Sequence, residues 1–513
     1  MQKPASKALQ AALFATGFSG VVAEYVLATL ASYFLGDSIV QWALTISLML
    51  FAMGLGSRFT KQVKSNEFIW FIGIEITLSI IVSFSALIIY SIAPYTSYLG
   101  LFIYLLSFIT GLLIGMELPL AIRLNQVYER IEINVSQILE KDYYGSLLGG
   151  IFFSFIGLPY LGLSYTPFVL GGVNLAVATL LVLIYHKHAI KQKSKSPSIA
   201  IVLSFVVIAI GLSHAQEIIE LSEQKNYKDK VVYSEQSKYQ QITITQWKDD
   251  YWLYLNGNLQ LSTYDEALYH EVLVHPAMLL TPHTRKVLLL GGGDGCAARE
   301  LLKYSSIESI TLVDLDPAVT ELAKSNLLLT QINDHSLSDD RVSVINGDGY
   351  HFMDTTHAIF DLIIIDLPDP RNVELSRLYS KEMYSICHKQ LGEQGVLITQ
   401  AGSPYFAHEA FYCIAKTIQS AGFSAIPMHN QIVTMGEWGW VLASKHLPSD
   451  HMLSILQNGE PEVPTKWLNN NALIQVTSFG KPYFRNKRDS IETNTFKNPI
   501  LYRYYLNGAW EMY

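Results

Sequence analysis

Cysteine is scarce in this chain, and its spacing carries no metal or redox signature. The 513 residues contain three cysteines, Cys296, Cys387 and Cys413, which stand far apart in the sequence. Disulfide frameworks and zinc sites need cysteines in pairs or close clusters, so this spacing argues against both. We therefore expect neither disulfides nor a metal ion. Internal repeats and low-complexity tracts are absent as well.

Charged residues are sparse in the first part of the chain. Residues 1–213 carry 12 Lys/Arg and 9 Asp/Glu, whereas residues 214–513 carry 24 and 35. The net charges are therefore +3 and −11, which sum to the −8 of the whole chain. A chain of 513 residues also exceeds one compact core. This division predicts a membrane domain followed by an acidic soluble domain.

The first 214 residues hold about seven apolar runs, each on the order of 20 residues and long enough to cross a bilayer. The runs lie near 8–30, 38–57, 67–90, 98–122, 144–162, 165–186 and 198–214. We predict an all-α polytopic membrane domain over residues 1–214. The first run is not a signal peptide, because it is too long, lacks a small-residue cleavage site and is followed by further runs.

Residues beyond 214 show soluble patterns. Residues 215–284 alternate apolar and polar side chains around an Asn256-Gly257 turn, which predicts a small β-sheet segment. Residues 285–445 alternate strands with helices, which predicts a Rossmann-like, mostly parallel sheet covered on both faces. Residues 446–513 form a polar C-terminal extension with scattered aromatics, which either covers the active site or binds a partner.

The most informative motif is VLLLGGGDG, residues 287–295. An apolar strand runs directly into Gly291, Gly293, Asp294 and Gly295, and a second strand ends at Asp314, 20 residues after Asp294. Glycines let the backbone turn tightly and approach a ligand, and an acid at the end of the second strand takes ribose hydroxyls. The strand, the following helix and the spaced acid together predict a nucleoside site.

Five acids should meet at the carboxyl ends of the parallel strands, where ligands bind in such sheets. They are Asp294, Asp314, Asp348, Asp366 and Asp369. The motifs contain no basic residue to balance them, and carboxylates repel phosphates. This excludes a phosphate site and predicts cationic ligands such as a sulfonium nucleoside and a polyamine. We expect no nucleic-acid partner.

Several spaced motifs resemble the spermidine synthase (polyamine aminopropyltransferase) family. The resemblance covers residues 231 to about 445. In family order the motifs are Tyr239-Gln240, DEALYHEVLVHP (265–276), GGGDG (291–295), Asp314, Gly347-Asp348-Gly349, DLPDP (366–370) and LYSKEMY (378–384). The joining of such a domain to a multi-span domain resembles a membrane-anchored subgroup of this family.

The resemblance implies transfer of the aminopropyl group of decarboxylated S-adenosylmethionine to an amine such as putrescine, with release of methylthioadenosine. The nucleoside would be a co-substrate and no cofactor would be tightly bound. The implied catalytic residues are Asp366, as base or orienter, and Tyr269. The acceptor side would be formed by Asp369, which holds an amine, with His270 and Gln400. We also expect a homo-oligomer, a dimer.

The donor site implied by the resemblance comprises Gln240, Gly291, Gly293, Asp294, Gly295, Asp314, Asp348 and Gly349. Asp314 would bind the ribose hydroxyls and Asp348 the adenine amino group. Asp294 would face the aminopropyl amine. An acid at that place also repels the carboxylate of ordinary S-adenosylmethionine, which is a physical basis for selecting the decarboxylated form.

The chain departs from the family pattern at two places. The family usually has DSSDP where this chain has DLPDP, so Leu367 removes a hydroxyl and Pro368 stiffens the loop. A tyrosine and a proline that grip putrescine in the family are replaced by Val433 and Thr434. The acceptor can therefore be longer than putrescine, differently shaped or not a polyamine.

Two other functions stay open on the sequence. One is an S-adenosylmethionine-dependent amine N-methyltransferase, against which Asp294 and the DLPDP acids argue. The other is a polyamine transporter or sensor without turnover. The intramembrane acids Glu24, Glu75 and Glu117 fit either a cation pathway or interhelical hydrogen bonds, with Arg123 a partner for Glu117.

The basic residues pose a topological question. With seven spans, three groups fall on one side: Lys3 and Lys7; Arg58, Lys61 and Lys64; Lys187, Lys191, Lys193 and Lys195. That side should be cytoplasmic in a bacterial inner or plasma membrane, which puts residues 215 onward outside. A nucleoside-dependent enzyme normally meets its substrate in the cytoplasm. We therefore expect a cytoplasmic catalytic domain with one re-entrant or miscounted span, and the alternative is an external domain.

Overall fold

The computed structural model describes residues 3–36, 38–96, 98–126, 128, 130–188, 196–480 and 490–510. The chain divides into two compact units, Met1–Val231 and Val232–Tyr513. We call them the helical unit and the α/β unit. Lys191, Lys193 and Lys195 of the basic run lie outside the described residues.

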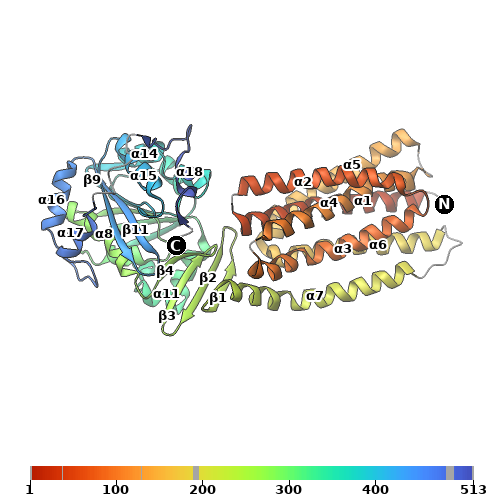
Figure 1. Ribbon diagram of the computed structural model, residues 1–513, viewed down its shortest axis with the longest axis horizontal. Helices are drawn as coiled ribbons and strands as arrows, with labels where there is room; N and C mark the ends of the chain where they lie inside the picture. Colours follow the sequence, from red (N-terminus) through yellow and green to blue (C-terminus); the bar gives the residue numbers. More distant parts are fainter. Residues whose placement is uncertain are drawn as a thin grey trace. The chain divides into compact units, whose positions relative to one another are not determined.

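The helical unit contains long apolar helices (Figure 1). They are α1 (Lys3–Leu35), α2 (Ser38–Phe59), α3 (Glu67–Ile92), α4 (Leu99–Asn125), α5 (Ile131–Phe152), α6 (Gly162–His188) and α7 (Ser196–Asn226), with short η1 (Thr60–Gln62) and η2 (Ala93–Tyr95) and the π-helical η3 (Phe153–Leu161). Six helical runs within the described residues are long and apolar enough to cross a membrane. The polytopic helical prediction is confirmed. The count differs from about seven because α5, η3 and α6 form one run, Ile131–Ile184.

That continuous run nevertheless reverses direction. Gly145 lies against Phe14 and Gly149 against Phe18, so α5 runs parallel to α1. By contrast, α6 runs antiparallel to α3, because Ser79 contacts Gly171 while the later Phe84 contacts the earlier Phe168. The reversal falls at Gly162, whose φ of 62° suits glycine. The predicted spans 144–162 and 165–186 are therefore two antiparallel passes.

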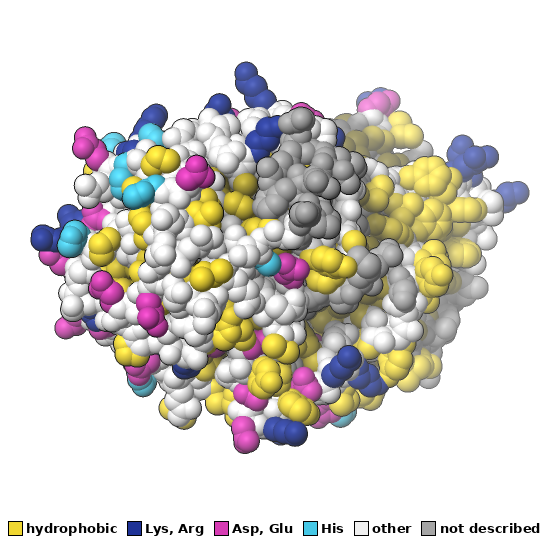
Figure 2. Space-filling view, turned by 60° about the vertical axis from the view of Figure 1, so that its left-hand side comes forward, with side chains coloured by type: hydrophobic (Ala, Val, Ile, Leu, Met, Phe, Trp, Pro, Cys, Tyr) yellow, Lys and Arg dark blue, Asp and Glu magenta, His cyan; other side chains and the backbone are white. Residues whose placement is uncertain are grey.

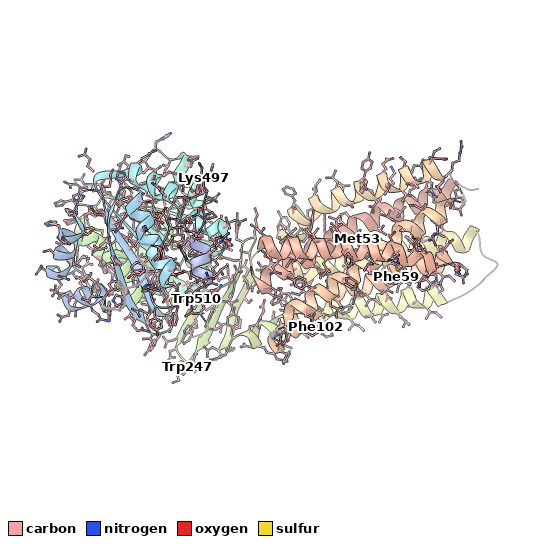
Figure 3. All side chains as sticks on the ribbon, turned by 45° about the horizontal axis from the view of Figure 1, so that its top comes forward. Met53, Phe59, Phe102, Trp247, Lys497 and Trp510 are labelled. Carbon is pink, nitrogen blue, oxygen red and sulfur yellow. The ribbon has the colours of Figure 1, made fainter. Side chains whose placement is uncertain are left out.

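Small residues bring α2 and α4 into close contact. A Cβ added at Gly56 would collide with the backbone carbonyl of Leu112, and one at Gly115 would collide with Met53. Such small-residue contacts are typical of helix packing in bilayers. Apolar side chains also cover the outside of the unit (Figure 2), and Figure 3 marks Phe59 and Phe102, which are 46% and 38% exposed. An apolar exterior of this kind suits a lipid environment.

Acidic side chains lie in the interior of the helical unit. Glu75 and Glu117 are buried, and neither oxygen of the Glu75 carboxyl has a hydrogen-bond partner among the described residues. The predicted pairing of Arg123 with Glu117 is wrong. Arg123 instead donates to the carbonyls of Thr60 and Val63, because these lie at the helix end where its guanidinium can reach them.

A small antiparallel sheet opens the α/β unit. Its strands are β1 (Lys230–Gln236), β2 (Gln241–Trp247), β3 (Asp250–Leu255) and β4 (Asn258–Ser262), in the order β1-β2-β3-β4. Asn256 and Gly257 join β3 to β4 with φ values of 50° and 75°. Positive φ at both turn residues is the signature of a type I′ hairpin, so the predicted turn is confirmed.

A seven-stranded sheet follows, in the order β10-β11-β9-β8-β5-β6-β7. Its strands are β5 (Lys286–Gly291), β6 (Ser309–Asp314), β7 (Val342–Asn346), β8 (Phe360–Asp366), β9 (Leu391–Gln400), β10 (Ser424–Ile432) and β11 (Gly436–Ser444). Strands β5 to β9 are parallel, whereas β11 is antiparallel to both β9 and β10. The mostly parallel Rossmann-like prediction is confirmed.

Helices cover both faces of this sheet. One face is covered by α8 (Ala267–Leu280), α9 (Cys296–Leu302), α10 (Pro317–Ser325), α11 (Leu327–Ile332), α16 (Ser449–Asn458) and α17 (Asn470–Val476). The other is covered by α12 (Gly349–Thr355), α14 (Lys381–Gln390), α15 (His408–Ser420) and α18 (Leu501–Leu506). The short α13 (Val373–Arg377) and η4 (Ser336–Ser338) complete the unit. Because central strands are buried on both sides, β5 is a continuous apolar run.

Candidate active site

Two neighbouring parallel strands end side by side at the centre of the site. Gly291 at the end of β5 is paired with Asp366 at the end of β8. Gly291 has φ of 80°, and a Cβ there would collide with the carbonyl of Asp366. Only glycine suits both the conformation and the close approach. The glycine motif thus brings the turn after β5 against the Asp366 backbone.

The second strand end, Asp314, is bound by the same glycine-rich turn. The Gly293 N–H donates to Asp314 Oδ2 at 3.1 Å, and the Asp316 N–H donates to Oδ1 at 3.0 Å. A Cβ on Gly293 would lie 2.6 Å from Oδ2, which explains the glycine. Burial raises the pKa of Asp314 to about 6, and the nearby Asp294 charge adds to the shift.

Tyr269 on α8 reaches the end of β8. Its hydroxyl donates to Asp366 Oδ1 at 2.6 Å, and its ring is buried. Burial raises the pKa of Asp366 to about 6, Asp294 adds to the rise, and the charge of His270 and the Tyr269 hydrogen bond oppose it. The structure therefore brings the two predicted catalytic residues together.

His270 supplies a basic group that the motif analysis did not count. Its Nδ1 lies 3.1 Å from Glu266 Oε2, and its Nε2 lies 3.9 Å from Asp294 Oδ1. Burial alone would lower the pKa of His270, but Glu266 and Asp294 outweigh it and the net shift is upward. The expectation of a site without basic groups is therefore wrong. The histidine stands beside the acids only because α8 packs against the strand ends.

Two arginines also neutralise predicted site acids. Arg377 lies 2.8 Å from Asp348 Oδ2, and Arg371 lies 3.7 Å from Asp369 Oδ2. Asp348 caps α12 by accepting from the His351 N–H at 2.8 Å. Arg377 gave no sequence signal, since its contact depends on α13. Arg371 follows the DLPDP motif directly and could have been noticed.

Gln400 holds the loop that follows β8. Its Nε2 donates to the Leu367 carbonyl at 2.6 Å and to the Tyr379 hydroxyl at 2.7 Å. Tyr379 in turn donates to the carbonyls of Leu367 and Pro368, at 2.8 and 3.1 Å. These hydrogen bonds hold the loop that carries Asp369 in place. A contact between Gln400 and the substrate stays a prediction.

Gln240 lies beside the donor-side turn. Its side-chain amide donates to Asp316 Oδ2 at 3.0 Å, and Ser237 donates to the same oxygen at 2.6 Å. Asp316 is buried and caps α10, and the motif analysis missed it although it precedes Pro317, a typical helix start. It joins the small sheet to the loop after β6.

Gly295 and Gly349, the remaining predicted glycines, differ in whether a larger side chain would fit. Gly295 has φ of 85°, and a Cβ there would meet Ser336 Oγ at 2.7 Å. Gly349 starts α12, and a Cβ there would make only ordinary contact, 3.8 Å from Leu290. Gly295 is therefore required by the backbone, whereas Gly349 is not.

The second departure from the family pattern is Val433-Thr434. Thr434 donates its N–H and its hydroxyl to the Asp265 carboxylate, both at 2.8 Å. Val433 beside it is 66% exposed. Neither residue offers an aromatic ring or a hydroxyl that is free for an acceptor.

Within the part of the chain that the structure describes, two side-chain groups are close enough for metal binding by distance alone, Glu266/His270/Cys296 and His270/Asp294/Asp366. Glu266 is already paired with Arg299, whose Nη2 lies 2.7 Å from Oε2. In the second group, Glu266 and Asp294 raise the pKa of His270 against the effect of burial, which favours the protonated ring over the neutral imidazole that binds metals. In both sets at least one of the three side chains is therefore already engaged by an ion pair within the protein.

Comparison with known proteins identifies close similarity over nearly the whole chain. The spermine/spermidine synthase domain matches residues 266–451. Polyamine aminopropyltransferase 2 of Aquifex aeolicus is 41% identical over 501 residues, which cover 98% of each chain. The polyamine aminopropyltransferase of Oceanobacillus iheyensis is 39% identical over 498 residues, 96% of each. The crystal structure of spermidine synthase from Thermotoga maritima matches with a TM-score of 0.44 and 29% identity, covering 49% of this chain and 85% of that chain.

Proposed function

The chain belongs to the spermine/spermidine synthase family and is a polyamine aminopropyltransferase, and from this premise we propose how its residues act. The donor is decarboxylated S-adenosylmethionine, and the acceptor is an amine such as putrescine. A lone pair on the acceptor nitrogen attacks the aminopropyl carbon bonded to sulfur. The new N–C bond forms as the C–S⁺ bond breaks, and methylthioadenosine leaves with the bonding electrons. The nitrogen then loses one proton.

Asp366 is the group that orients the acceptor nitrogen and takes this proton. The observation that carries the assignment is the 2.6 Å hydrogen bond from Tyr269 to Asp366, at the meeting point of two strand ends. With a pKa of about 6, Asp366 is mostly ionised at neutral pH and can accept a proton from an ammonium. Tyr269 fixes the carboxylate by one oxygen and leaves the other for the substrate.

Replacement of Asp366 by Asn tests this role. Positioned acid–base groups contribute about 10²- to 10⁴-fold, so kcat should fall by about that factor. Detergent-solubilised protein should keep its melting temperature and its affinity for methylthioadenosine. Turnover is followed by mass spectrometry as methylthioadenosine plus aminopropylated amine. Unchanged kcat in the folded variant would refute the role. If the helical unit transports polyamine, that transport should persist in the same variant.

The donor lies along the turn after β5. Asp314 binds the ribose hydroxyls, and Asp348 contacts the adenine amino group. Asp294 faces the aminopropyl ammonium, because its carboxylate stands beside Asp366 and His270 and is only partly buried. The Gly291–Gly295 turn lets the backbone approach the nucleoside. No resident metal takes part in this proposal.

Asp294 selects the decarboxylated donor. A carboxylate on the substrate would stand next to the Asp294 carboxylate, and like charges at close range disfavour binding. Asp294→Asn should weaken binding of decarboxylated S-adenosylmethionine and strengthen that of S-adenosylmethionine. Competition of both against methylthioadenosine binding measures the ratio. An unchanged ratio would contradict the assignment, and methylated amine from ordinary S-adenosylmethionine would favour the methyltransferase alternative.

We propose that the enzyme is a multi-pass membrane protein, which the long apolar helices of the helical unit support. We also propose that it forms a homodimer. Figure 1 shows the start of α1 and the end of α7 at opposite ends of the helical unit. Figure 3 labels Phe59, the last residue of α2, toward the start of α1, and the Arg58 and Lys61 cations are its close neighbours in the sequence. The positive-inside rule then favours an external α/β unit, whereas the cytoplasmic expectation requires one helix that does not cross. A single cysteine introduced at Lys228 of a variant without native cysteines separates the two: labelling in intact cells means external, and labelling only after lysis means cytoplasmic.

A further inference from the structure

The C-terminal segment, residues 490–510, contacts the loop that carries Asp369. Tyr505 on α18 donates its hydroxyl to Asp369 Oδ2 at 2.7 Å. Both side chains are buried, with 5% and 8% exposure. Tyr505 lies 54 residues beyond the end of the matched family domain at 451, so this contact adds a group that the domain itself does not contain.

Neighbouring residues of the C-terminal segment hold Tyr505 in place. The indole N–H of Trp510 donates to the Tyr505 carbonyl at 2.8 Å, and the two rings lie 4.7 Å apart (Figure 3 marks Trp510). The Ala509 N–H donates to the Phe406 carbonyl at 2.7 Å, which ties the segment to the loop before α15. The position of the Tyr505 hydroxyl is therefore fixed by these contacts.

The two oxygens of Asp369 are used differently. Oδ2 accepts from Tyr505 and faces Arg371, whose guanidinium lies 3.7 Å away. Among the described residues, Oδ1 has one long contact, 3.4 Å from Gln400 Nε2. A carboxylate oxygen can accept more than one hydrogen bond, so Oδ1 is the edge available to an ammonium group.

The pKa of Asp369 also depends on Arg371, Tyr505 and Gln400. Burial raises the pKa of Asp369, while Arg371, the Tyr505 hydroxyl and Gln400 act against the rise. A protonated Asp369 would offer no negative charge to an amine. Tyr505 thus orients a buried acid and favours its ionised form over its protonated form.

We propose that the C-terminal segment completes the acceptor-amine site and that Tyr505 is the positioning residue for Asp369. The ligand class is a primary ammonium, bound at Asp369 Oδ1 while the reacting nitrogen sits at Asp366. This inference rests on the proposed function, since it concerns the acceptor of the same reaction. It makes the segment beyond residue 490 part of acceptor selection.

The test compares Tyr505→Phe with Tyr502→Phe in full-length, detergent-solubilised protein. Both lose one hydroxyl from α18, but Tyr502 contacts Arg503 and not Asp369. Tyr505→Phe should raise the KM for the acceptor about tenfold or more, with the donor KM and the melting temperature close to those of the wild type. Its acceptor KM should also recover at higher pH, because Asp369 then ionises despite the missing hydrogen bond. Tyr502→Phe should match the wild type.

Two results would overturn the inference. An acceptor KM in Tyr505→Phe equal to that of the wild type would remove Tyr505 from the site. Equal losses in donor KM, acceptor KM and melting temperature, without the pH recovery, would show a structural role only. Failure of the proposed function is distinguishable, because the wild-type protein would then give no methylthioadenosine with any amine offered.

Discussion

Removal of the Tyr269 hydroxyl should move the acid limb of the activity profile upward. Asp366 acts when ionised, so activity falls as pH drops through its pKa of about 6. On that value the ionised fraction is about 90% at pH 7 and about 10% at pH 5. The hydrogen bond from Tyr269 stabilises the ionised form. A hydrogen bond to a charged group is worth about 1.5–3 kcal/mol, which corresponds to about 1–2 pKa units.

The acid limb of Tyr269→Phe should therefore lie at about pH 7–8, about 1–2 units above that of the wild type. The variant should lose activity at pH 7 and regain much of it about one unit above its own limb, near pH 8–9. The assay is kcat/KM for the donor at saturating acceptor, measured from pH 5 to 9. Titration of the free acceptor amine is the same for both proteins, so the difference isolates the enzyme group.

Tyr304→Phe is the matched control for this experiment. Tyr304 is buried to nearly the same degree as Tyr269, at 9% against 8% exposure, and its hydroxyl bonds His275 at 2.8 Å. It loses one buried hydrogen bond but does not touch Asp366, so its acid limb should stay in place. Coincident profiles of Tyr269→Phe and the wild type would refute the reasoning, as would an equal shift in the control.

Two glycine substitutions test the packing of each unit. Gly293→Ala places a Cβ 2.6 Å from Asp314 Oδ2, so the KM for the donor should rise about tenfold. In Gly347→Ala the added Cβ meets nothing within 4 Å, so the donor KM should stay unchanged. Equal donor KM values for the two variants in a steady-state assay would contradict this prediction. In the helical unit, Gly56→Ala collides with an α4 carbonyl and should cost about 1–3 kcal/mol, while Gly54→Ala meets nothing within 4 Å. Thermal unfolding in detergent should rank Gly54→Ala above Gly56→Ala, and the reverse order would count against close α2–α4 packing.

The sequence by itself determined the two-unit layout and the donor side of the site. Apolar runs without charges can only be satisfied by lipid or a buried core, and a strand that enters a glycine turn places the following acid by its spacing alone. The Tyr269–Asp366 contact spans 97 residues and was expected only from the family resemblance. The strand-end positions of Gly291, Gly293 and Asp314 follow from the short motifs themselves. These features are local, so short segments carry the whole signal.

Only the tertiary structure decided the charge balance of the site. His270 follows Glu266 by four residues, so helical spacing alone pairs these two. His270 meets Asp294 only because α8 packs against the strand ends, and no spacing in the sequence reports that contact. Tyr505 reaches Asp369 across 136 residues of chain. The contact exists because α18 packs beside α15 on the same face of the sheet. Long-range contacts of this kind depend on how separate elements pack, and that information is distributed over the whole chain.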